Sequence, residues 1–239
     1  MLRKAVLGLL MLTAWQAQAE YQCQVKPQDD IFISAQNVRV VGASGDVTIR
    51  PDGAVVRNGQ TLSLSAAQQR QAQDYQAALR RDLPWIDEGA SQRLEQGRLS
   101  LDRVIVKQLG SDSNVRNRLT TLNQQLKQQM NRILEHRSEG LAFHHQAISQ
   151  VEQDGRRIVQ QSMGGVVQDS LNEMGVKQSV NLSGNNPLQA MMGNLGTLQQ
   201  AIQTEWNNQE QDFEQFGHQV CQKVTQLETQ RSTLLQSLK

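Results

Sequence analysis

The sequence predicts a mainly helical α+β fold, in which a small N-terminal antiparallel β meander precedes long amphipathic helices that form an elongated helical hairpin or bundle. Short runs of β-branched residues, separated by turn signals, occupy residues 30–64. From residue 66 onwards, apolar residues recur at spacings of three and four. We expect one integrated domain over 20–239, with the meander in 20–64 and the helices in 65–239.

Residues 1–19 have the features of a secretory signal peptide. Arg3 and Lys4 precede a short apolar run, and small residues around Ala19 form a cleavage site. The run is too short to span a membrane, which takes about 20 apolar residues, and no later stretch approaches that length. The sequence therefore predicts an exported protein of the bacterial periplasm, cleaved after Ala19 and without a transmembrane segment.

The two cysteines, Cys23 and Cys221, lie near opposite ends of the mature chain. In an oxidising compartment two cysteines most simply form one disulfide. A lipid-modified Cys23 is a second interpretation, although the preceding residues 20–22 lack the leucine and small residues that this modification prefers. Two buried free thiols are a third interpretation.

The β prediction for residues 30–64 rests on alternating short runs and turns. Asn58-Gly59 is the strongest hairpin signal, because both residues tolerate positive φ. The other turns fall at 42–45 and 51–53, and the predicted strands contain Ile31–Ile33, Val38–Val41, Val47–Ile49, Ala54–Val56 and Leu62–Leu64.

The first helices are predicted at 66–82 and 85–109. Ser65 has the character of an N-cap, Pro84 separates the two helices, and Gly110 provides a stop. A long helical region follows over 115–176, with bends or breaks expected at its glycines, Gly140, Gly155, Gly164 and Gly165.

Residues 175–196 are predicted to form a loop, and 197–237 the last helix. Polar Gln209 and Arg231 occupy two positions of the apolar stripe of this helix. The sustained spacing suggests coiled-coil-like packing, most simply as an antiparallel hairpin with the 115–176 region. A Cys23–Cys221 bridge would then fasten the N-terminal segment to the last helix.

The charge pattern disfavours nucleic acid and anionic membrane surfaces as partners. Without Arg3 and Lys4 the mature chain has 22 basic and 23 acidic residues, and no basic cluster stands out. No cofactor is predicted.

The histidines do not have metal-ligand spacing. His144 and His145 are adjacent, and a helix would point them about 100° apart, while His136 lies eight residues before His144. His144 falls on the apolar stripe and is expected to be a partly buried structural residue. Glu214 and His218 share a helical face, more typical of an exposed pair than of half a metal site. We therefore predict no metal site.

No catalytic residues are predicted. Adjacent carboxylates occur at Asp29-Asp30 and Asp87-Glu88, and a glycan hydrolase would need two such groups in one cleft. Asp87 and Glu88 are explained as first-turn residues that favour the helix dipole. Nucleophile elbows, phosphate-binding loops, dinucleotide fingerprints and zinc-protease motifs do not occur.

Met163, Met191 and Met192 lie in segments rich in glycine and small apolar residues. Methionine surfaces adapt to varied partners, so these residues form a possible docking tip for a protein or lipid. A hairpin tip that packs on itself is the alternative explanation.

The chain resembles the YggN family of exported bacterial proteins, which carries a domain of unknown function. The resemblance covers essentially the whole mature chain and rests on residues 26–30, 83–90, 170–175, 186–189, 203–206 and 212–217 with Cys221. It implies a periplasmic location and no assigned activity, and it supplies no catalytic residues.

Three functions remain open from the sequence. The first is a non-enzymatic interaction protein of the envelope, such as an adaptor or a chaperone-like helical protein, which the long amphipathic helices favour. The second is an envelope-acting enzyme with an unrecognised site. The third is a protein that binds lipid or another apolar ligand between its helices. Neither the partner nor the oligomeric state follows from the sequence.

Overall fold

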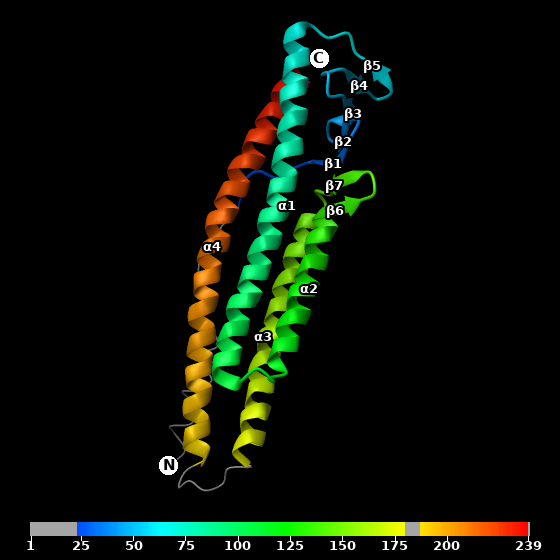
Figure 1. Ribbon diagram of the computed structural model, residues 1–239. Helices are drawn as coiled ribbons and strands as arrows, with labels where there is room; N and C mark the ends of the chain where they lie inside the picture. Colours follow the sequence, from blue (N-terminus) through cyan, green and yellow to red (C-terminus); the bar gives the residue numbers. More distant parts are fainter. Residues whose placement is uncertain (1–22, 180–186, 239) are drawn as a thin grey trace.

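The computed structural model describes residues 23–179 and 187–238, with side chains described for 23–173 and 196–238. The described helices run side by side along one axis, and a β-sheet lies beside them at one end (Figure 1). The helices are α1 (Ala66–Leu109), α2 (Val115–Ile133), α3 (Ala147–Ser179) and α4 (Pro187–Ser237). At 1.5 Å per residue, α4 is about 75 Å long. None of the described helices is both long enough and apolar enough to cross a membrane. The helices, together with the β-sheet at one end of them, confirm the predicted mainly helical α+β fold.

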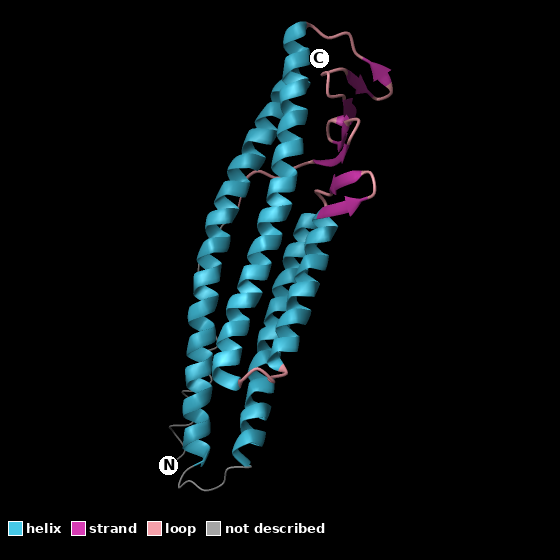
Figure 2. Cartoon of the chain, in the orientation of Figure 1, coloured by secondary structure: helices cyan, strands magenta, loops and turns pink. Residues whose placement is uncertain are grey.

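The sheet is antiparallel, with seven strands in the order β5-β4-β3-β2-β1-β7-β6. Figure 2 shows these strands gathered at one end of the helices. The strands are β1 (Asp29–Ser34), β2 (Val38–Gly42), β3 (Gly45–Ile49), β4 (Val55–Arg57), β5 (Gln60–Thr61), β6 (Leu134–Arg137) and β7 (Gly140–Phe143). The predicted meander region supplies β1 to β5, but its last strand is Gln60–Thr61, and the predicted strand Leu62–Leu64 is wrong because these residues lead into α1 without forming a strand. Asn58-Gly59 forms the turn between β4 and β5 with positive φ at both residues.

The first hydrophobic core lies between the sheet, the N-terminal half of α1 and the C-terminal part of α4. Alternate residues of the meander point into it, because successive strand side chains face opposite sides of a sheet. Val38, Ile49 and Val55 are fully buried there against Leu79 of α1, with Leu234 of α4 2% exposed. The meander has too few large apolar residues for a core of its own, so the helices complete it.

The second core lies near the other end of the bundle. All four helices contribute to it, through Leu101, Ile105 and Leu109 of α1, Val115 and Leu119 of α2, Val166 of α3, and Leu198 and Ile202 of α4.

The predicted interruption at Pro84 is wrong, because α1 continues through it to Leu109. A proline inside a helix removes one hydrogen bond and costs about 3 kcal/mol. Packing on both sides offsets this cost, since Leu79 and Leu83 are buried before the proline and Phe216 of α4 packs on Gly89 after it. The predicted start is correct, because Ser65 and Gln68 form a reciprocal capping box.

The predicted helical region 115–176 is interrupted by a β-hairpin. Helix α2 ends at Ile133, β6 and β7 pair with each other, and β7 also pairs with β1. Gly140 begins β7 with φ +146°, and a side chain there would collide with the carbonyl of Ile33. Short apolar runs such as 141–143 fit both helical and strand periodicity, which explains the error.

Gly155, Gly164 and Gly165 do not break α3, which is continuous from Ala147 to Ser179. The helices also extend into the segment predicted as a loop, since α3 ends at Ser179 and α4 starts at Pro187.

Helix α4 packs mainly against α1, whereas α2 pairs with α3. Figure 1 shows α1 between α4 and α2. We predicted that the last helix would pair mainly with the 115–176 region as an antiparallel hairpin. This prediction is wrong, because α1 is the main partner of α4. The short connection 110–114 makes α1 and α2 antiparallel neighbours, and the hairpin returns the chain directly from α2 to α3.

The predicted disulfide between Cys23 and Cys221 is confirmed, with the two Cα atoms 5.6 Å apart. It attaches the segment before β1 to α4.

The two polar residues on the apolar stripe of α4 have different roles. Gln209 lies over Gly97 of α1, where a side chain would contact it. Arg231 reaches the sheet, where its Nη1 donates to Asp29 Oδ2 at 3.1 Å and to the Ser44 hydroxyl at 2.8 Å.

Candidate functional site

The surface where α1 meets α4 carries an exposed aromatic side chain on a rigid support. Trp85 of α1 is 36% exposed, and its ring centroid lies 5.3 Å from that of Phe216 of α4. The Lys223 ammonium stands 4.7 Å from the centroid of the Trp85 ring, which is a cation–π distance. Phe216 is buried against Gly89, where a Cβ atom would come within 2.6 Å of its ring. We call the group formed by Trp85, Phe216, Lys223, Asp82 and Arg81 the Trp85 surface.

A buried ion pair fixes Lys223 beside the indole. Asp82 is 1% exposed and accepts hydrogen bonds from Lys223 Nζ at 2.8 Å and from Arg81 Nη2 at 2.8 Å. Burial alone would raise the pKa of Asp82, but the hydrogen bonds from Arg81 and Lys223 outweigh it and lower the pKa. Asp82 is therefore ionised at neutral pH and holds both cations in place. The disulfide at Cys221 lies two residues from Lys223 and restrains the same stretch of α4.

A second cluster joins the β6–β7 hairpin to its neighbours through three histidines. His145 Nδ1 lies 2.6 Å from Asp30 Oδ1, and His144 lies 3.5 Å from Asp30 Oδ2 and 3.0 Å from Glu135 Oε2. His136 Nε2 lies 2.8 Å from Asp87 Oδ2 of α1. His144 is partly buried, as predicted, but it follows β7 in a turn and does not lie on a helical stripe.

The carboxyl groups of this cluster have lowered pKa values. Burial would raise the pKa of Asp30, but hydrogen bonds from His145 and His144 outweigh it and hold the pKa below its ordinary value of 3.8. Hydrogen bonds from Arg137 and then from His144 lower the pKa of Glu135. Both groups are therefore held as carboxylates, which suits structural pairing with the histidines.

Replacing Asp30 with asparagine is expected to destabilise the protein at pH 7 by about 1–3 kcal/mol, the usual contribution of a charged hydrogen bond. A carboxyl group whose pKa is lowered on folding stabilises the protein above its unfolded pKa, and this contribution is lost as the pH falls through the folded pKa. The difference between wild type and Asp30→Asn should therefore shrink below pH 3.8. Urea unfolding at pH 7, 5 and 3 measures it.

The matched control is Asp74→Asn, which changes an exposed aspartate on α1 that makes no hydrogen bond within the described chain. We expect this variant to follow wild type at every pH. A deficit in Asp30→Asn that is the same size at all three pH values would contradict the assignment.

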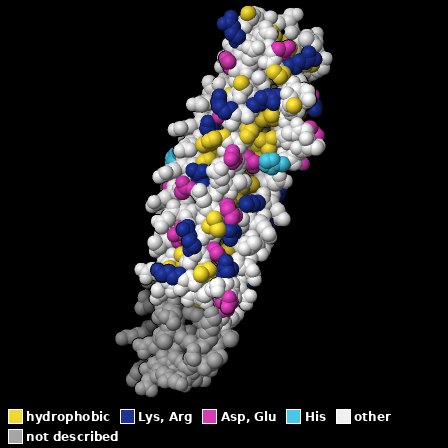
Figure 3. Space-filling model, viewed as in Figure 1, with side chains coloured by type: hydrophobic (Ala, Val, Ile, Leu, Met, Phe, Trp, Pro, Cys, Tyr) yellow, Lys and Arg dark blue, Asp and Glu magenta, His cyan; other side chains and the backbone are white. Residues whose placement is uncertain are grey.

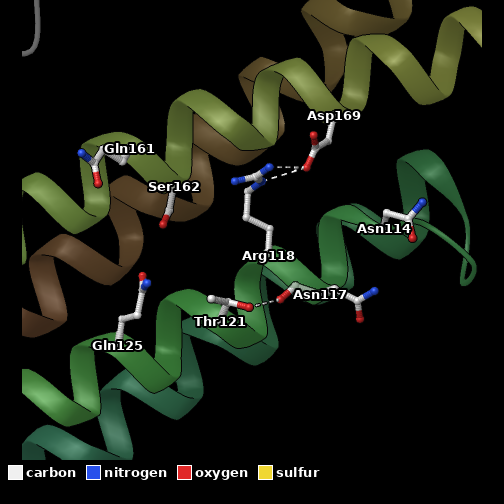
Figure 4. Close-up of a pocket in the computed structure, with 8 residues that line it drawn as sticks. All are labelled: Asn114, Asn117, Arg118, Thr121, Gln125, Gln161, Ser162 and Asp169. Carbon is white, nitrogen blue, oxygen red and sulfur yellow. Dashed lines mark hydrogen bonds and ion pairs between the residues drawn. The ribbon is translucent and has the colours of Figure 1, made fainter.

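A polar cleft of about 430 Å³ lies between α2 and α3. The residues that line it all have polar side chains: Asn114, Asn117, Arg118, Thr121 and Gln125 from α2 and the residue before it, and Gln161, Ser162 and Asp169 from α3. The residues from α2 recur at spacings of three and four, so they share one helical face. Figure 4 shows Arg118 extending from α2 across the cleft to Asp169 of α3.

Arg118 and Asp169 form an ion pair in the middle of this cleft. Arg118 Nε and Nη2 each lie 2.8 Å from Asp169 Oδ2. The guanidinium passes directly over Gly165, where a Cβ atom would lie 2.3 Å from Arg118 Cζ. Gly165, predicted as a helix break, is instead the position that lets Arg118 lie against α3.

The predicted carboxylate pairs are held apart by different partners. Asp29 pairs with Arg231 and Ser44, whereas Asp30 faces the histidines. Asp87 and Glu88 lie in the middle of α1, so the first-turn explanation is wrong, and Asp87 instead pairs with His136. Glu214 and His218 are both exposed. Within the described residues, no group of three or more histidine, cysteine or acidic side chains is placed to hold a metal ion.

Met163 packs, partly buried, against the second core. The side chains of Met191 and Met192 lie outside the described residues, so the docking tip stays a prediction. Sequence reasoning missed the Trp85 surface and the cleft. Arg118, Gly165 and Asp169 become neighbours only through the pairing of α2 with α3, for which the sequence gives no local signal.

Figure 3 shows apolar side chains reaching the surface on one face toward the sheet end, beside acidic side chains and a histidine. Ile33, Ile86 and Leu141 are partly buried residues at the edge of the first core. Trp85 lies on the same stretch of α1 as Ile86, so aromatic and aliphatic groups reach the surface in this part of the molecule.

These features define a helical bundle covered at one end by an antiparallel sheet, with an exposed tryptophan and a polar cleft on its surface. The chain belongs to the family described as "Protein of unknown function (DUF2884)", whose model matches residues 23–239. The protein described as "Uncharacterized protein YggN" in Escherichia coli strain K12 is 54% identical over 240 residues, which cover 100% of each chain. The same values hold for the proteins of that description in the O6:H1 and O157:H7 strains. No solved structure matches.

Proposed function

We propose that this chain is an exported, non-enzymatic interaction protein of the periplasm, adaptor or chaperone-like, and that it binds a protein partner through the Trp85 surface. The observation that carries the proposal is the 36% exposure of Trp85 on a support that leaves the ring little freedom. Tryptophan and arginine are the residues most enriched among binding hot spots. A side chain that is already fixed loses little conformational entropy when a partner binds.

The surroundings of Trp85 support this proposal. Lys223 stands beside the ring. Arg81, which pairs with the same Asp82 as Lys223, has a side chain that is 65% exposed and can offer donors to a partner. A hydrophobic anchor bordered by polar and charged groups is the usual composition of a protein-binding surface.

Export is supported by the disulfide and by the sequence of residues 1–19. A disulfide that closes most of the chain suits an oxidising compartment. The signal peptide and cleavage after Ala19 remain part of the proposal, since residues 1–22 lie outside the described residues. Detection of the mature N-terminus at Glu20 by mass spectrometry tests this part.

The partner is tested by site-specific photo-crosslinking in intact cells. The crosslinking amino acid replaces Trp85 in one strain and Leu99 in the control strain. Leu99 is also on α1 and is 45% exposed, but it lies about 21 Å further along the helix. We expect a discrete adduct with another protein from position 85 and a much weaker one from position 99.

A third strain carries the crosslinking amino acid at Met192, in the predicted docking tip. Adducts from 192 alone would overturn the assignment to the Trp85 surface and favour the tip. Equal adducts from 85 and 99 would also contradict it, because they would indicate non-specific proximity.

A further inference from the structure

The cleft between α2 and α3 contains polar groups that the folded chain leaves without partners. Ser162 is only 9% exposed, yet its hydroxyl makes no hydrogen bond within the described residues. Other helical hydroxyls nearby donate to the carbonyl four residues earlier, as Ser170 does to Val166 at 2.6 Å and Thr121 to Asn117 at 3.0 Å. The Ser162 hydroxyl is therefore open to the cleft and free to bond to water or to a ligand there.

Amide side chains surround this hydroxyl. Gln125 of α2 and Gln161 of α3 lie on either side of the cleft near Ser162 (Figure 4), and neither side-chain amide has a hydrogen-bond partner within the described chain. Asn117 lines the cleft with an equally free side-chain amide. Arg118 uses Nε and Nη2 for Asp169, and in Figure 4 its third nitrogen points toward the Ser162 side of the cleft.

The charge and polarity of the lining narrow the chemistry of the ligand. Arg118 and Asp169 are the two charged side chains among the eight lining residues, and they neutralise each other. A neutral ligand is therefore favoured over phosphate or another anion. Each amide offers donors and an acceptor, so the matching ligand carries groups that both donate and accept, as hydroxyl groups do. Eight lining residues that all have polar side chains suit such a molecule better than an acyl chain.

We propose that this cleft binds a neutral saccharide, with the Ser162 hydroxyl, the amides of Gln125 and Gln161, and the free guanidinium nitrogen of Arg118 as its hydrogen-bonding groups. The cleft volume of about 430 Å³ lies in the lower part of the range of about 300–1,000 Å³ for small-molecule sites. The open form and the lack of an aromatic platform among the lining residues indicate weak binding. This site is separate from the Trp85 surface, and either proposal can fail without the other.

Gly165 and Gly164 provide a matched pair of variants. A Cβ atom at Gly165 would lie 2.3 Å from Arg118 Cζ, so Gly165→Ala forces the guanidinium out of its present position over α3. A Cβ atom at Gly164 meets nothing within 4 Å. Both substitutions put alanine in the same helix and raise helix propensity equally. The two variants therefore differ in the cleft and not in the intrinsic stability of α3.

The experiment is ligand-observed saturation-transfer NMR on the full mature protein with its disulfide intact. The probes are maltose and N,N′-diacetylchitobiose at millimolar concentration, and triglycine is the peptide control. We expect wild type and Gly164→Ala to transfer saturation to at least one saccharide. In Gly165→Ala the dissociation constant should rise at least ~10-fold, because the charged hydrogen bond that Arg118 donates to the saccharide is lost. Circular dichroism confirms that each variant is folded.

A second pair of variants tests the hydroxyl itself. Ser162→Ala should weaken saccharide binding about fivefold, the effect of one hydrogen bond of about 1 kcal/mol. Ser170→Ala removes a hydroxyl that is fully buried and bonded within α3, and should leave binding unchanged.

Three outcomes would overturn the proposal. The first is no transfer to either saccharide in wild type, and the second is equal binding by Gly165→Ala and wild type. The third is a Gly165-dependent signal from triglycine alone, which would assign the cleft to peptides.

Discussion

Reduction of the Cys23–Cys221 disulfide is expected to lower the midpoint of thermal unfolding by about 5–15 °C. The two cysteines are 198 residues apart, so the bridge closes a loop that contains most of the chain. In the chain-entropy model a loop of this length contributes about 5 kcal/mol, and measured values for disulfides are more often about 2–4 kcal/mol. Each kcal/mol shifts the midpoint of a domain of this size by about 2–4 °C.

The measurement is thermal unfolding followed by circular dichroism, with and without a phosphine reductant. The variant carrying both Cys23→Ser and Cys221→Ser is the control. It should melt where reduced wild type melts, and reductant should not change it. If a thiol assay shows complete reduction while the midpoint stays in place, the bridge adds nothing to stability.

Replacing Arg231 with methionine is expected to cost about 3–5 kcal/mol of unfolding free energy. Asp29 is 2% exposed, and its Oδ2 lies 3.1 Å from Arg231 Nη1. The backbone N–H and the hydroxyl of Ser44 also donate to Asp29, at 2.8 and 2.6 Å. Methionine fills similar space without the charge, so the Asp29 carboxylate would remain buried without its counter-ion.

Urea denaturation of Arg231→Met, Asp29→Asn and the double variant measures the coupling between the two residues. Because Asp29→Asn removes the buried charge, the double variant should lose less than the sum of the two single losses. Arg103→Met is the control, since Arg103 is exposed and contacts only its own helix. Its effect should stay within about 0.5 kcal/mol. Strict additivity in the double variant would contradict a direct pairing of Arg231 with Asp29.

The role of Arg231 illustrates what the sequence conveys about α4. On the apolar stripe an arginine stands out, but the stripe does not identify its partner. Asp29 lies 202 residues away, on the first strand. Only the packing of α4 against the sheet brings the two together, so the sequence marks the anomaly and the tertiary structure explains it.

The candidate sites were less predictable than the fold. Trp85 is one of three tryptophans in the sequence, and its exposure depends on how closely α4 covers α1. The cleft combines ordinary polar residues from two helices, and polar helical residues are most often solvent-facing. Neither site has a local signature, because each arises from the juxtaposition of two helices.

The sequence by itself determined the features that depend on near neighbours. These are the first four strands of the meander, the Asn58-Gly59 turn, the N-cap at Ser65, the end of α1 before Gly110, and the pairing of the only two cysteines. The strands, the turn and the helix ends follow from backbone preferences and from side-chain periodicity over a few residues. The disulfide follows from the number of cysteines, because with two cysteines each has a single possible partner.

The tertiary structure alone decided the features that depend on distant contacts. Residues 134–143 become strands because β1, more than 100 positions earlier, offers an edge to pair with, and α1 passes through Pro84 because α4 packs on both sides of it. In both places the local preference is weak or opposed, and burial and backbone pairing against a remote segment contribute more free energy than the local preference costs.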